Sequence, residues 1–212
     1  MGVMKPIVAL VCFASLLAAA AESLSVFGQK WTITTPAADW SVGDNLLQLK
    51  TSSEPIPGQP RRPTHFALLD SKPYSKVTVE GEFKPNGRSL IIVYAYENES
   101  HFNYAHMSSD NAVKQNVHNG MFHVFGGERV RMSELEGPAS FTAKDWTPVK
   151  LVWDGATGLA YVEVNGKRNP SLTATDMSLK WGQVGLGSFD ETGDFRNIKV
   201  TGTMVEPGQV GR

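Results

Sequence analysis

The sequence WDGATGLAYVEVNG, from Trp153 to Gly166, contains the clearest secondary-structure signals in the chain. Apolar and β-branched residues fill Val149 to Trp153 and Leu159 to Val164, and the segment Asp154 to Gly158 between them predicts a turn. The pair Asn165-Gly166 predicts a second tight turn, because both residues tolerate the positive φ of a two-residue hairpin loop. This region therefore predicts consecutive antiparallel strands.

Similar apolar runs, separated by turn residues, continue on both sides of this region. The chain shows no amphipathic helical period, and Ser53 to Pro63 is a proline-rich loop in which a helix and a central strand are both disfavoured. Ser89 to Tyr96 is apolar at nearly every position, which predicts a central strand covered on both faces. The other predicted strands are Gln29 to Thr35, Leu46 to Thr51, His65 to Leu69, Lys76 to Phe83, Phe102 to Met107, Met121 to Phe125, Arg129 to Ser133, Gln183 to Ser188 and Asn197 to Thr201. We therefore predict an all-β, two-sheet antiparallel β-sandwich.

Two of these regions carry a resemblance to a known superfamily. Trp153 to Gly166, together with VGLGSFDETGDF from Val184 to Phe195, resembles the closing half of the concanavalin A-like lectin/glucanase superfamily. His101 to Met107, His118-Asn119-Gly120 and Arg129 to Ser133 resemble the middle of its laminin-G-like and 3-keto-disaccharide hydrolase-type domains, which occur in secreted bacterial proteins. The resemblance implies a jelly-roll sandwich that holds a carbohydrate in the groove of its concave sheet.

The amino terminus has the pattern of a cleavable signal peptide. A basic start, Met1 to Lys5, precedes the apolar run Ile7 to Ala19, and small residues up to Ala21 provide a cleavage site before Glu22. We therefore predict a signal peptide over 1–21, a sandwich domain over 22–204 and a flexible tail over 205–212. The one cysteine, Cys12, would leave with the signal peptide. These features predict a secreted or periplasmic protein without a membrane span.

The charge balance narrows the class of partner. The chain has 20 basic and 21 acidic residues, and Arg129 with Arg131 is the nearest approach to a basic patch. Nucleic acids and anionic membranes select clustered Lys and Arg, so neither is an expected partner. We predict a monomer that binds an oligo- or polysaccharide.

Histidines and aromatic residues gather in the middle of the chain. His101, His106, His118 and His123 lie within 23 residues, from position 101 to 123, and alternate with phenylalanine and tyrosine. Strand alternation places Phe102, Tyr104 and His106 on one face and His101 with Asn103 on the other. A flat aromatic surface beside polar donors suits a sugar ring, although each histidine could equally be an ordinary strand residue. The predicted ligand-binding residues are Tyr104, His106, His118, Asn119 and Arg131.

The sequence leaves catalysis open. Glu80 and Glu82 share one strand face, and paired carboxylates are typical of glycoside hydrolysis, but the Glu-x-Asp-x-x-Glu pattern of the superfamily's retaining glucanases is absent. A non-catalytic lectin-like domain and a glycoside hydrolase of the 3-keto-disaccharide type, with His106, His118 or Glu82 as acid or base, both remain. A polysaccharide lyase and an adhesion module are minor alternatives, and the spacing of Gln115 and His118 differs from the Gln-x-His of lyases.

Metal binding is a further open question. His101 and His106 are five residues apart, as are His118 and His123, so each pair would point to opposite strand faces and would not share a zinc ion. The resemblance implies calcium instead, with Asp190, Glu191, Asp194 and Asn197 as oxygen ligands.

Overall fold

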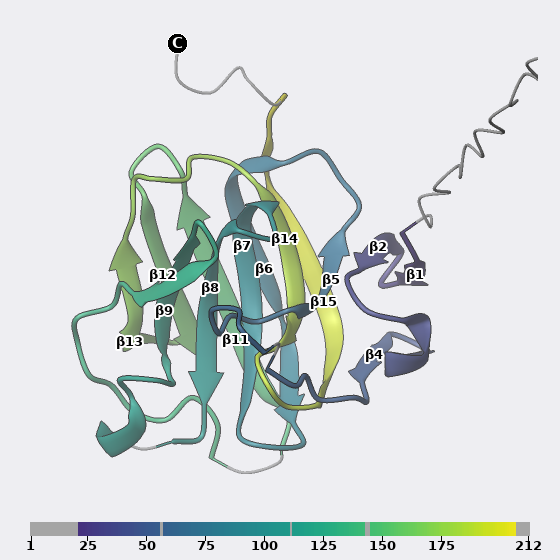
Figure 1. Ribbon diagram of the computed structural model, residues 1–212, viewed down its shortest axis with the longest axis horizontal. Coiled ribbons are helices and arrows are strands. Elements are labelled where there is room, and N and C mark those ends of the chain that lie inside the picture. Colours follow the sequence, from purple (N-terminus) through teal and green to yellow (C-terminus); the bar gives the residue numbers. More distant parts are fainter. Residues whose placement is uncertain (1–20, 56, 111, 143–144, 207–212) are drawn as a thin grey trace, which may run out of the picture.

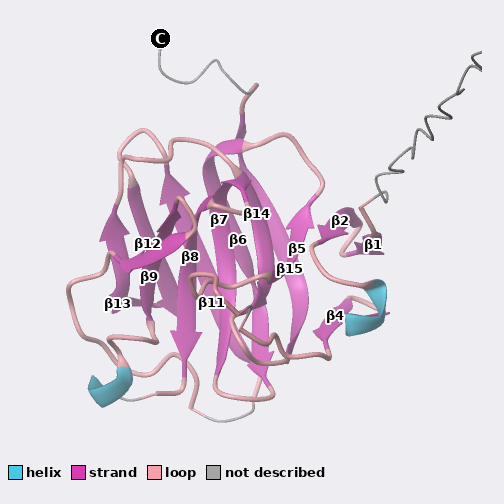
Figure 2. Ribbon diagram, viewed as in Figure 1, coloured by secondary structure: helices cyan, strands magenta, loops and turns pink. Residues whose placement is uncertain are grey.

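Two antiparallel β-sheets, packed face to face, make up the protein (Figure 1 and Figure 2). The computed structural model describes residues 21–55, 57–110, 112–142 and 145–206. Two short 3-10 helices, η1 (Ala37–Asp39) and η2 (Ala112–Lys114), lie in connections between strands. The predicted all-β, two-sheet sandwich is therefore confirmed.

The first sheet has eight strands in the order β1-β2-β5-β14-β7-β8-β9-β10. β7 lies between β14 and β8, which confirms the central strand predicted from its apolar sequence. The bounds are β1 (Ser23–Val26), β2 (Gln29–Ile33), β5 (His65–Leu69), β14 (Gln183–Ser188), β7 (Ser89–Asn98), β8 (His101–Ser108), β9 (Gly120–Phe125) and β10 (Glu128–Arg131).

The second sheet has seven strands in the order β13-β12-β11-β6-β15-β4-β3. The hairpin predicted at Asp154 to Gly158 joins β11 to β12, in a register that runs from Val149 opposite Val164 to Asp154 opposite Leu159. The bounds are β13 (Lys167–Thr175), β12 (Leu159–Val164), β11 (Thr147–Asp154), β6 (Tyr74–Pro85), β15 (Gly193–Met204), β4 (Leu46–Leu49) and β3 (Trp40–Gly43).

Three strands lie outside the ranges predicted from sequence, namely β1, β3 and β13. β13 contains Pro170, which argues against a central strand, but β13 is the edge of its sheet and an edge strand tolerates a missing N–H donor. Asn165 and Gly166, with φ of 51° and 72°, form the tight turn between β12 and β13. The second predicted hairpin is therefore confirmed.

Apolar side chains bury both faces of the eight-stranded sheet. Alternate residues of β7, such as Ile92 and Tyr94, enter the core between the sheets, while Ile91 and Val93 point to the outer face. The outer-face residues form a second apolar cluster, which comprises Phe66, Leu68, Ile91, Val93, Phe102, Tyr104, Phe122, Val124 and Phe189. The predicted alternation of β8, with Phe102, Tyr104 and His106 on one face, is thereby confirmed.

The proline-rich loop after β4 lies against this second apolar cluster. Ser53 Oγ donates a hydrogen bond to the backbone carbonyl of Phe189, and Thr34 Oγ1 donates one of 2.6 Å to the carbonyl of Thr64. The Arg62 guanidinium donates one of 3.0 Å to the carbonyl of Glu99. In Figure 1 this dark-blue loop crosses in front of the strands. The outer face of the eight-stranded sheet is therefore partly covered by the chain itself.

The two ends of the domain can be compared with the predicted boundaries. The predicted signal peptide lies almost entirely outside the described residues, and Glu22 accepts a backbone hydrogen bond of 3.0 Å from Ile33. In the predicted tail, the Val205 N–H donates to the Pro73 carbonyl over 2.8 Å, and Glu206 pairs with Lys72. Among the residues that the structure describes, no helix is long and apolar enough to cross a membrane.

Candidate functional site

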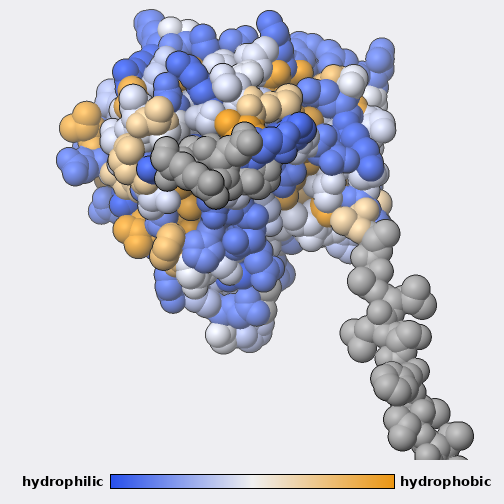
Figure 3. All heavy atoms as spheres, turned by 90° about the horizontal axis from the view of Figure 1, so that it is seen from above, coloured by the Kyte–Doolittle hydropathy of each residue, from blue (hydrophilic) through white to orange (hydrophobic). Residues whose placement is uncertain are grey.

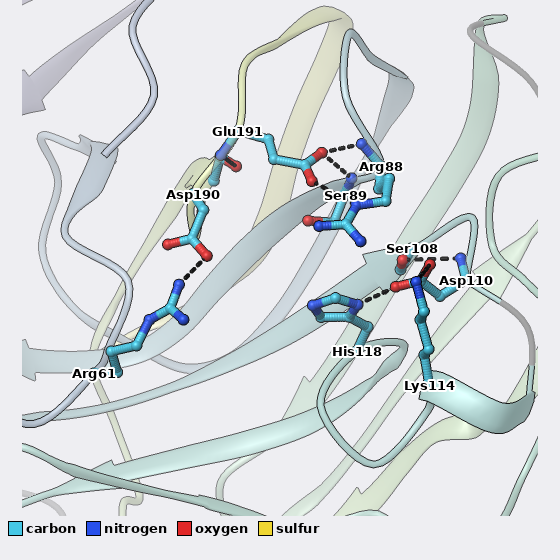
Figure 4. Close-up of polar contacts among 10 residues, drawn as sticks. Arg61, Arg88, Ser89, Ser108, Asp110, Lys114, His118, Asp190 and Glu191 are labelled. Atoms are coloured by element: carbon cyan, nitrogen blue, oxygen red, sulfur yellow. Dashed lines mark hydrogen bonds and ion pairs between the residues drawn. The ribbon is translucent and has the colours of Figure 1, made fainter. Parts of the chain in front are cut away.

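Loops from four parts of the sequence meet at one end of the outer face of the eight-stranded sheet (Figure 4). These four segments are the proline-rich loop after β4, the β6–β7 turn, the β8–β9 connection and the β14–β15 connection. We call this set the polar rim, and it consists of Arg61, Arg88, Asp110, His118, Asp190 and Glu191.

Ion pairs and backbone hydrogen bonds fix the polar rim. Arg61 pairs with Asp190, and Arg88 Nε lies 3.1 Å from Glu191 Oε1. Glu191 also accepts a hydrogen bond of 2.9 Å from the Ser89 N–H. The Arg61 and Arg88 side chains are 52% and 55% exposed, whereas Glu191 is 17% exposed. An approaching ligand therefore meets the guanidinium groups before this carboxylate.

His118 is held by a carboxylate within the rim. Its Nδ1 contacts Asp110 Oδ2, and the Asp110 side chain is 8% exposed. Burial by itself would raise the pKa of Asp110, but the hydrogen bond from His118 and the charges of His118, Lys114 and Arg88 outweigh burial and lower that pKa. Asp110 is therefore a carboxylate at neutral pH and orients the His118 ring.

His106 lies directly beneath the rim and is 1% exposed. Its ring stacks on Phe189 with centroids 5.7 Å apart, and His118 meets it edge-on at 5.0 Å. Its ring nitrogens have no close hydrogen-bond partner among the described residues, and the Val117 backbone only partly opposes the lowering of its pKa. Burial lowers the pKa of His106 well below 6.5, and the positive charges of His118, Arg129 and Arg131 lower it further. His106 is therefore a neutral ring in the floor of the site.

The buried His106 predicts a pH-dependent stability. Its pKa is lower in the folded than in the unfolded chain, so the unfolded chain binds the extra proton and stability falls as pH decreases below about 6.5. His106 alone is expected to lower the free energy of unfolding by up to about 1.4 kcal/mol for each pH unit of acidification. His106→Phe keeps a ring against Phe189 and removes the titration, so its stability should change less between pH 7 and pH 5.

Urea unfolding of both proteins at the two pH values measures this difference. His65 also has a pKa lowered by burial, partly offset by Asp39, and it contributes a background in the same direction to both proteins. An identical pH dependence in wild type and His106→Phe would contradict the prediction.

Two predicted binding residues act as supports for the His118 loop. The Arg131 guanidinium donates to the backbone carbonyl of Gln115, to that of His118 over 3.2 Å and to that of Asn119 over 3.3 Å. Asn119 is fully buried, and its amide donates to Pro138 O over 2.8 Å. Both side chains therefore hold the loop that carries His118, and their predicted contacts with a ligand stay predictions.

Tyr104 is also fully buried, in contrast to its predicted role as an accessible groove residue. Its ring stacks on Phe122 with centroids 5.2 Å apart and planes 11° apart. The hydroxyl has no hydrogen-bond partner in the part of the chain that is described. Burial raises its pKa, although the nearby Arg129 opposes this shift. Tyr104 is therefore a floor residue, like His106.

Glu82 cannot act together with the histidines, because it belongs to β6 in the other sheet. Arg196 binds it through two hydrogen bonds of 3.0 Å, and these bonds are the main reason that the pKa of Glu82 is lowered. Glu82 therefore lies apart from the other two acid or base candidates, His106 and His118, and its own candidacy stays a prediction.

The predicted calcium ligands do not converge. Asp190 pairs with Arg61, Asp194 accepts a hydrogen bond of 3.1 Å from Gln48, and Asn197 contacts Asn45. Among residues 21–206, leaving aside the gaps at 56, 111 and 143–144, no group of three or more His, Cys, Asp or Glu could hold a metal ion. Asp190, Asp194 and Asn197 are thus each bound to a different part of the protein, and calcium binding stays a prediction.

A cleft opens near the carboxyl end of β7, away from the polar rim. It has a volume of about 330 Å³, and its lining includes Phe66, Tyr96, Arg62, Glu99 and Thr64. The rings of Phe66 and Tyr96 meet edge-on with centroids 6.1 Å apart. Ser89, which donates to Glu191 of the rim, and Tyr96 at the cleft are seven positions apart on β7, which is roughly 23 Å at a strand rise of about 3.3 Å. Aromatic and polar groups thus line both ends of the outer face.

Comparisons with known proteins place the fold. No protein-family model and no curated protein sequence matches the chain. The carbohydrate-binding module CBM66 from Bacillus subtilis is similar in structure, with a TM-score of 0.61 and 14% identity over 80% of this chain and 94% of that chain. A Bacillus subtilis protein of unknown function with a galectin-like fold has a TM-score of 0.50 and 13% identity over 83% of this chain and 90% of that one.

A third similar structure is the exoplasmic/lumenal domain of VIP36 in its Ca²⁺/Man3GlcNAc-bound form. It has a TM-score of 0.51 and 11% identity over 84% of this chain and 86% of that one. At these identities the likeness shows the fold alone. The order of the two antiparallel sheets and these three structures lead to one conclusion: the chain has the concanavalin A-like β-sandwich fold.

Proposed function

We propose that this protein is an exported carbohydrate-binding domain that takes a glycan at the polar rim and along the outer face of the eight-stranded sheet. The observation that carries the proposal is the rim itself, where donors and acceptors from four loops surround an aromatic floor. Sugar hydroxyls both donate and accept hydrogen bonds, so a mixed set of guanidinium, imidazole and carboxylate groups suits them. CBM66 and the Man3GlcNAc-bound VIP36 domain give the proposal support from similar folds.

Export is part of the proposal and rests on the signal-peptide pattern that ends at Ala21. The mass of the protein recovered from the medium or periplasm tests it. A chain that begins at Glu22 is expected, and an uncleaved or cytoplasmic product would contradict the export.

His118→Ala is expected to weaken glycan binding about 10-fold or more, because a hydrogen bond that involves a charged or strongly polarised group contributes about 1.5–3 kcal/mol. The measurement is calorimetric titration with the best ligand from a glycan array. His101→Ala is the matched control, since His101 packs on Phe125 at 4.6 Å and takes no part in the polar rim. Equal affinities for wild type and a folded His118→Ala variant would contradict the assignment of the site.

The His118–Asp110 pair gives a specific reason to keep a glycoside hydrolase as a second candidate. A histidine oriented by a buried carboxylate is an arrangement that general acid–base catalysis uses. A hydrolysis assay on the bound glycan distinguishes the two functions. Turnover that is lost in Asp110→Asn while binding persists would favour the enzyme, and binding without turnover in wild type would favour the lectin-like domain.

The alternative of adhesion through apolar contacts would require a large exposed apolar surface. Hydrophilic residues predominate on the face seen in Figure 3, and apolar residues form small groups between them. The end of the molecule seen there, looking along the strands, therefore gives no support to adhesion through apolar contacts.

A further inference from the structure

We propose that the glycan is acidic and that Arg129 binds its anionic group, either a carboxylate or a sulfate ester. This inference rests on the proposed function and specifies its class of ligand. It starts from Phe189, whose ring carries two guanidinium groups. The Cζ atom of Arg129 lies 4.6 Å from the ring centroid, and that of Arg61 lies 5.1 Å from it.

Only one of these two cations has a carboxylate partner. Arg61 pairs with Asp190, whereas Arg129 forms no ion pair with any described carboxylate. Arg88, the other arginine of the rim, pairs with Glu191, and Lys114 beside the rim lies 3.9 Å from Asp110. Arg129 therefore lies beside the polar rim, and its positive charge is not balanced by any of the rim's ion pairs.

A further positive charge, that of Arg131, lies near the neighbouring Phe122 ring. The Cζ atoms of Arg129 and Arg131 lie 5.6 and 5.7 Å from the Phe122 centroid. Arg131 donates to backbone carbonyls, which leave its charge unneutralised. Three guanidinium groups and one carboxylate therefore gather over Phe122 and Phe189, and they leave two positive charges (three minus one). The whole chain has a net charge of −1, so this concentration is local.

Unused hydrogen-bonding groups lie in the same place. The Tyr104 hydroxyl and both ring nitrogens of His106 are buried without a close hydrogen-bond partner among the described residues, with Arg129 beside the Tyr104 hydroxyl and the Val117 backbone beside His106. Tyr104 stacks on Phe122, and His106 stacks on Phe189, so both polar groups belong to the floor that Arg129 adjoins. Buried polar groups are nearly always paired in native proteins. Arg129 thus lies beside polar and aromatic groups that carry no countercharge, so its positive charge is left for the anionic group of a ligand.

The chemistry of arginine selects the anion. Its planar guanidinium matches a carboxylate or sulfate with two parallel hydrogen bonds, and such charge-assisted bonds are about twice as strong as neutral ones. Arg129 is partly exposed on β10, between the exposed Glu128 and Val130. It can therefore meet a ligand without unfolding of the loops around it.

The experiment compares three sets of oligosaccharides of matched length: uronate-containing, sulfated and neutral. The full domain from Glu22 onward is titrated with each set, as wild type, Arg129→Gln and Arg168→Gln. Arg168, on the other sheet, is the matched control because its Cζ lies 4.1 Å from the Tyr161 ring centroid and it has no ion pair with a carboxylate in the described part of the chain.

Wild type is expected to bind one acidic set about 10-fold or more tightly than the neutral set, with affinity that decreases as salt increases. Arg129→Gln should lose this preference and keep its neutral binding, while Arg168→Gln should behave as wild type. Arg129→Lys keeps the positive charge but not the planar guanidinium, so it should keep only part of the preference for acidic oligosaccharides. This variant replaces Arg129→Gln in the comparison if Arg129→Gln does not fold. The set that binds identifies carboxylate or sulfate.

Two results would overturn the inference alone. They are equal affinity for acidic and neutral sets, and an acidic preference that survives Arg129→Gln. In both cases the proposed carbohydrate function stands. If no saccharide of any set binds, the proposed function itself fails.

Discussion

Trp153→Ala is expected to lower the free energy of unfolding by about 3–5 kcal/mol, the range found when a large buried aromatic side chain is removed. Trp153 is fully buried on β11, between β12 and β6. Its ring contacts Tyr94 of β7, with centroids 5.7 Å apart and planes 51° apart. The side chain therefore joins the two sheets, and its loss leaves a cavity that strands paired on both sides cannot close.

Urea unfolding measures this effect, and Trp146→Ala is its control. Trp146 is only partly buried and interacts with the Arg196 guanidinium, whose Cζ is 4.2 Å from the ring centroid. Its removal should cost about 1 kcal/mol or less, since the contact is near the surface. Similar losses in the two variants would contradict the role given to Trp153.

Gly187→Val is expected to destabilise the protein by about 3 kcal/mol through overpacking. Gly187 lies on β14, opposite Phe66 of β5 on one side and Ile91 of β7 on the other. A Cβ atom at this position would lie 2.0 Å from the backbone carbonyl oxygen of His65. Because that oxygen belongs to a paired strand, relief of the clash requires β5 or β14 to move.

Gly43→Ala is the control for this substitution. A Cβ atom there would make ordinary contacts with Leu46 at 3.4 and 3.5 Å, and β3 is an edge strand. We expect a stability within about 0.5 kcal/mol of wild type or slightly above it, because alanine restricts the unfolded chain. Thermal unfolding of the two variants is the test, and a Gly187→Val protein as stable as Gly43→Ala would contradict the clash.

The sequence predicted the sandwich because its strands carry local signals. The turn at Asn165-Gly166 and the unbroken apolar run of β7 each depend on neighbouring residues alone. The edge strand β13 was missed because Pro170 disfavours a strand unless the strand's position in the sheet is known. Local sequence does not contain that position.

The candidate site was harder to predict, because alternation tells which residues share a face and not what covers that face. Tyr104 and His106 do share the outer face of β8, but neighbouring segments bury both. Asp110 and Arg61 were missed, since loops far apart in sequence bring them to His118 and Asp190. The four-residue run from Ser188 to Glu191, within the resemblance to the superfamily, is the signal that could have indicated the rim.

The position of the last two strands governs how the protein can fold. β14 is inserted between β5 and β7, and β15 is inserted between β6 and β4, so each sheet receives an interior strand from the final part of the domain. Neither sheet is continuous until residues 183–204 have been synthesised, and β5 and β7 cannot be joined before then. Such long-range pairing makes folding slow relative to proteins with local contacts. We therefore expect the nascent chain to remain without its native core until β14 and β15 have been synthesised, which leaves time for the still unfolded polypeptide to be exported.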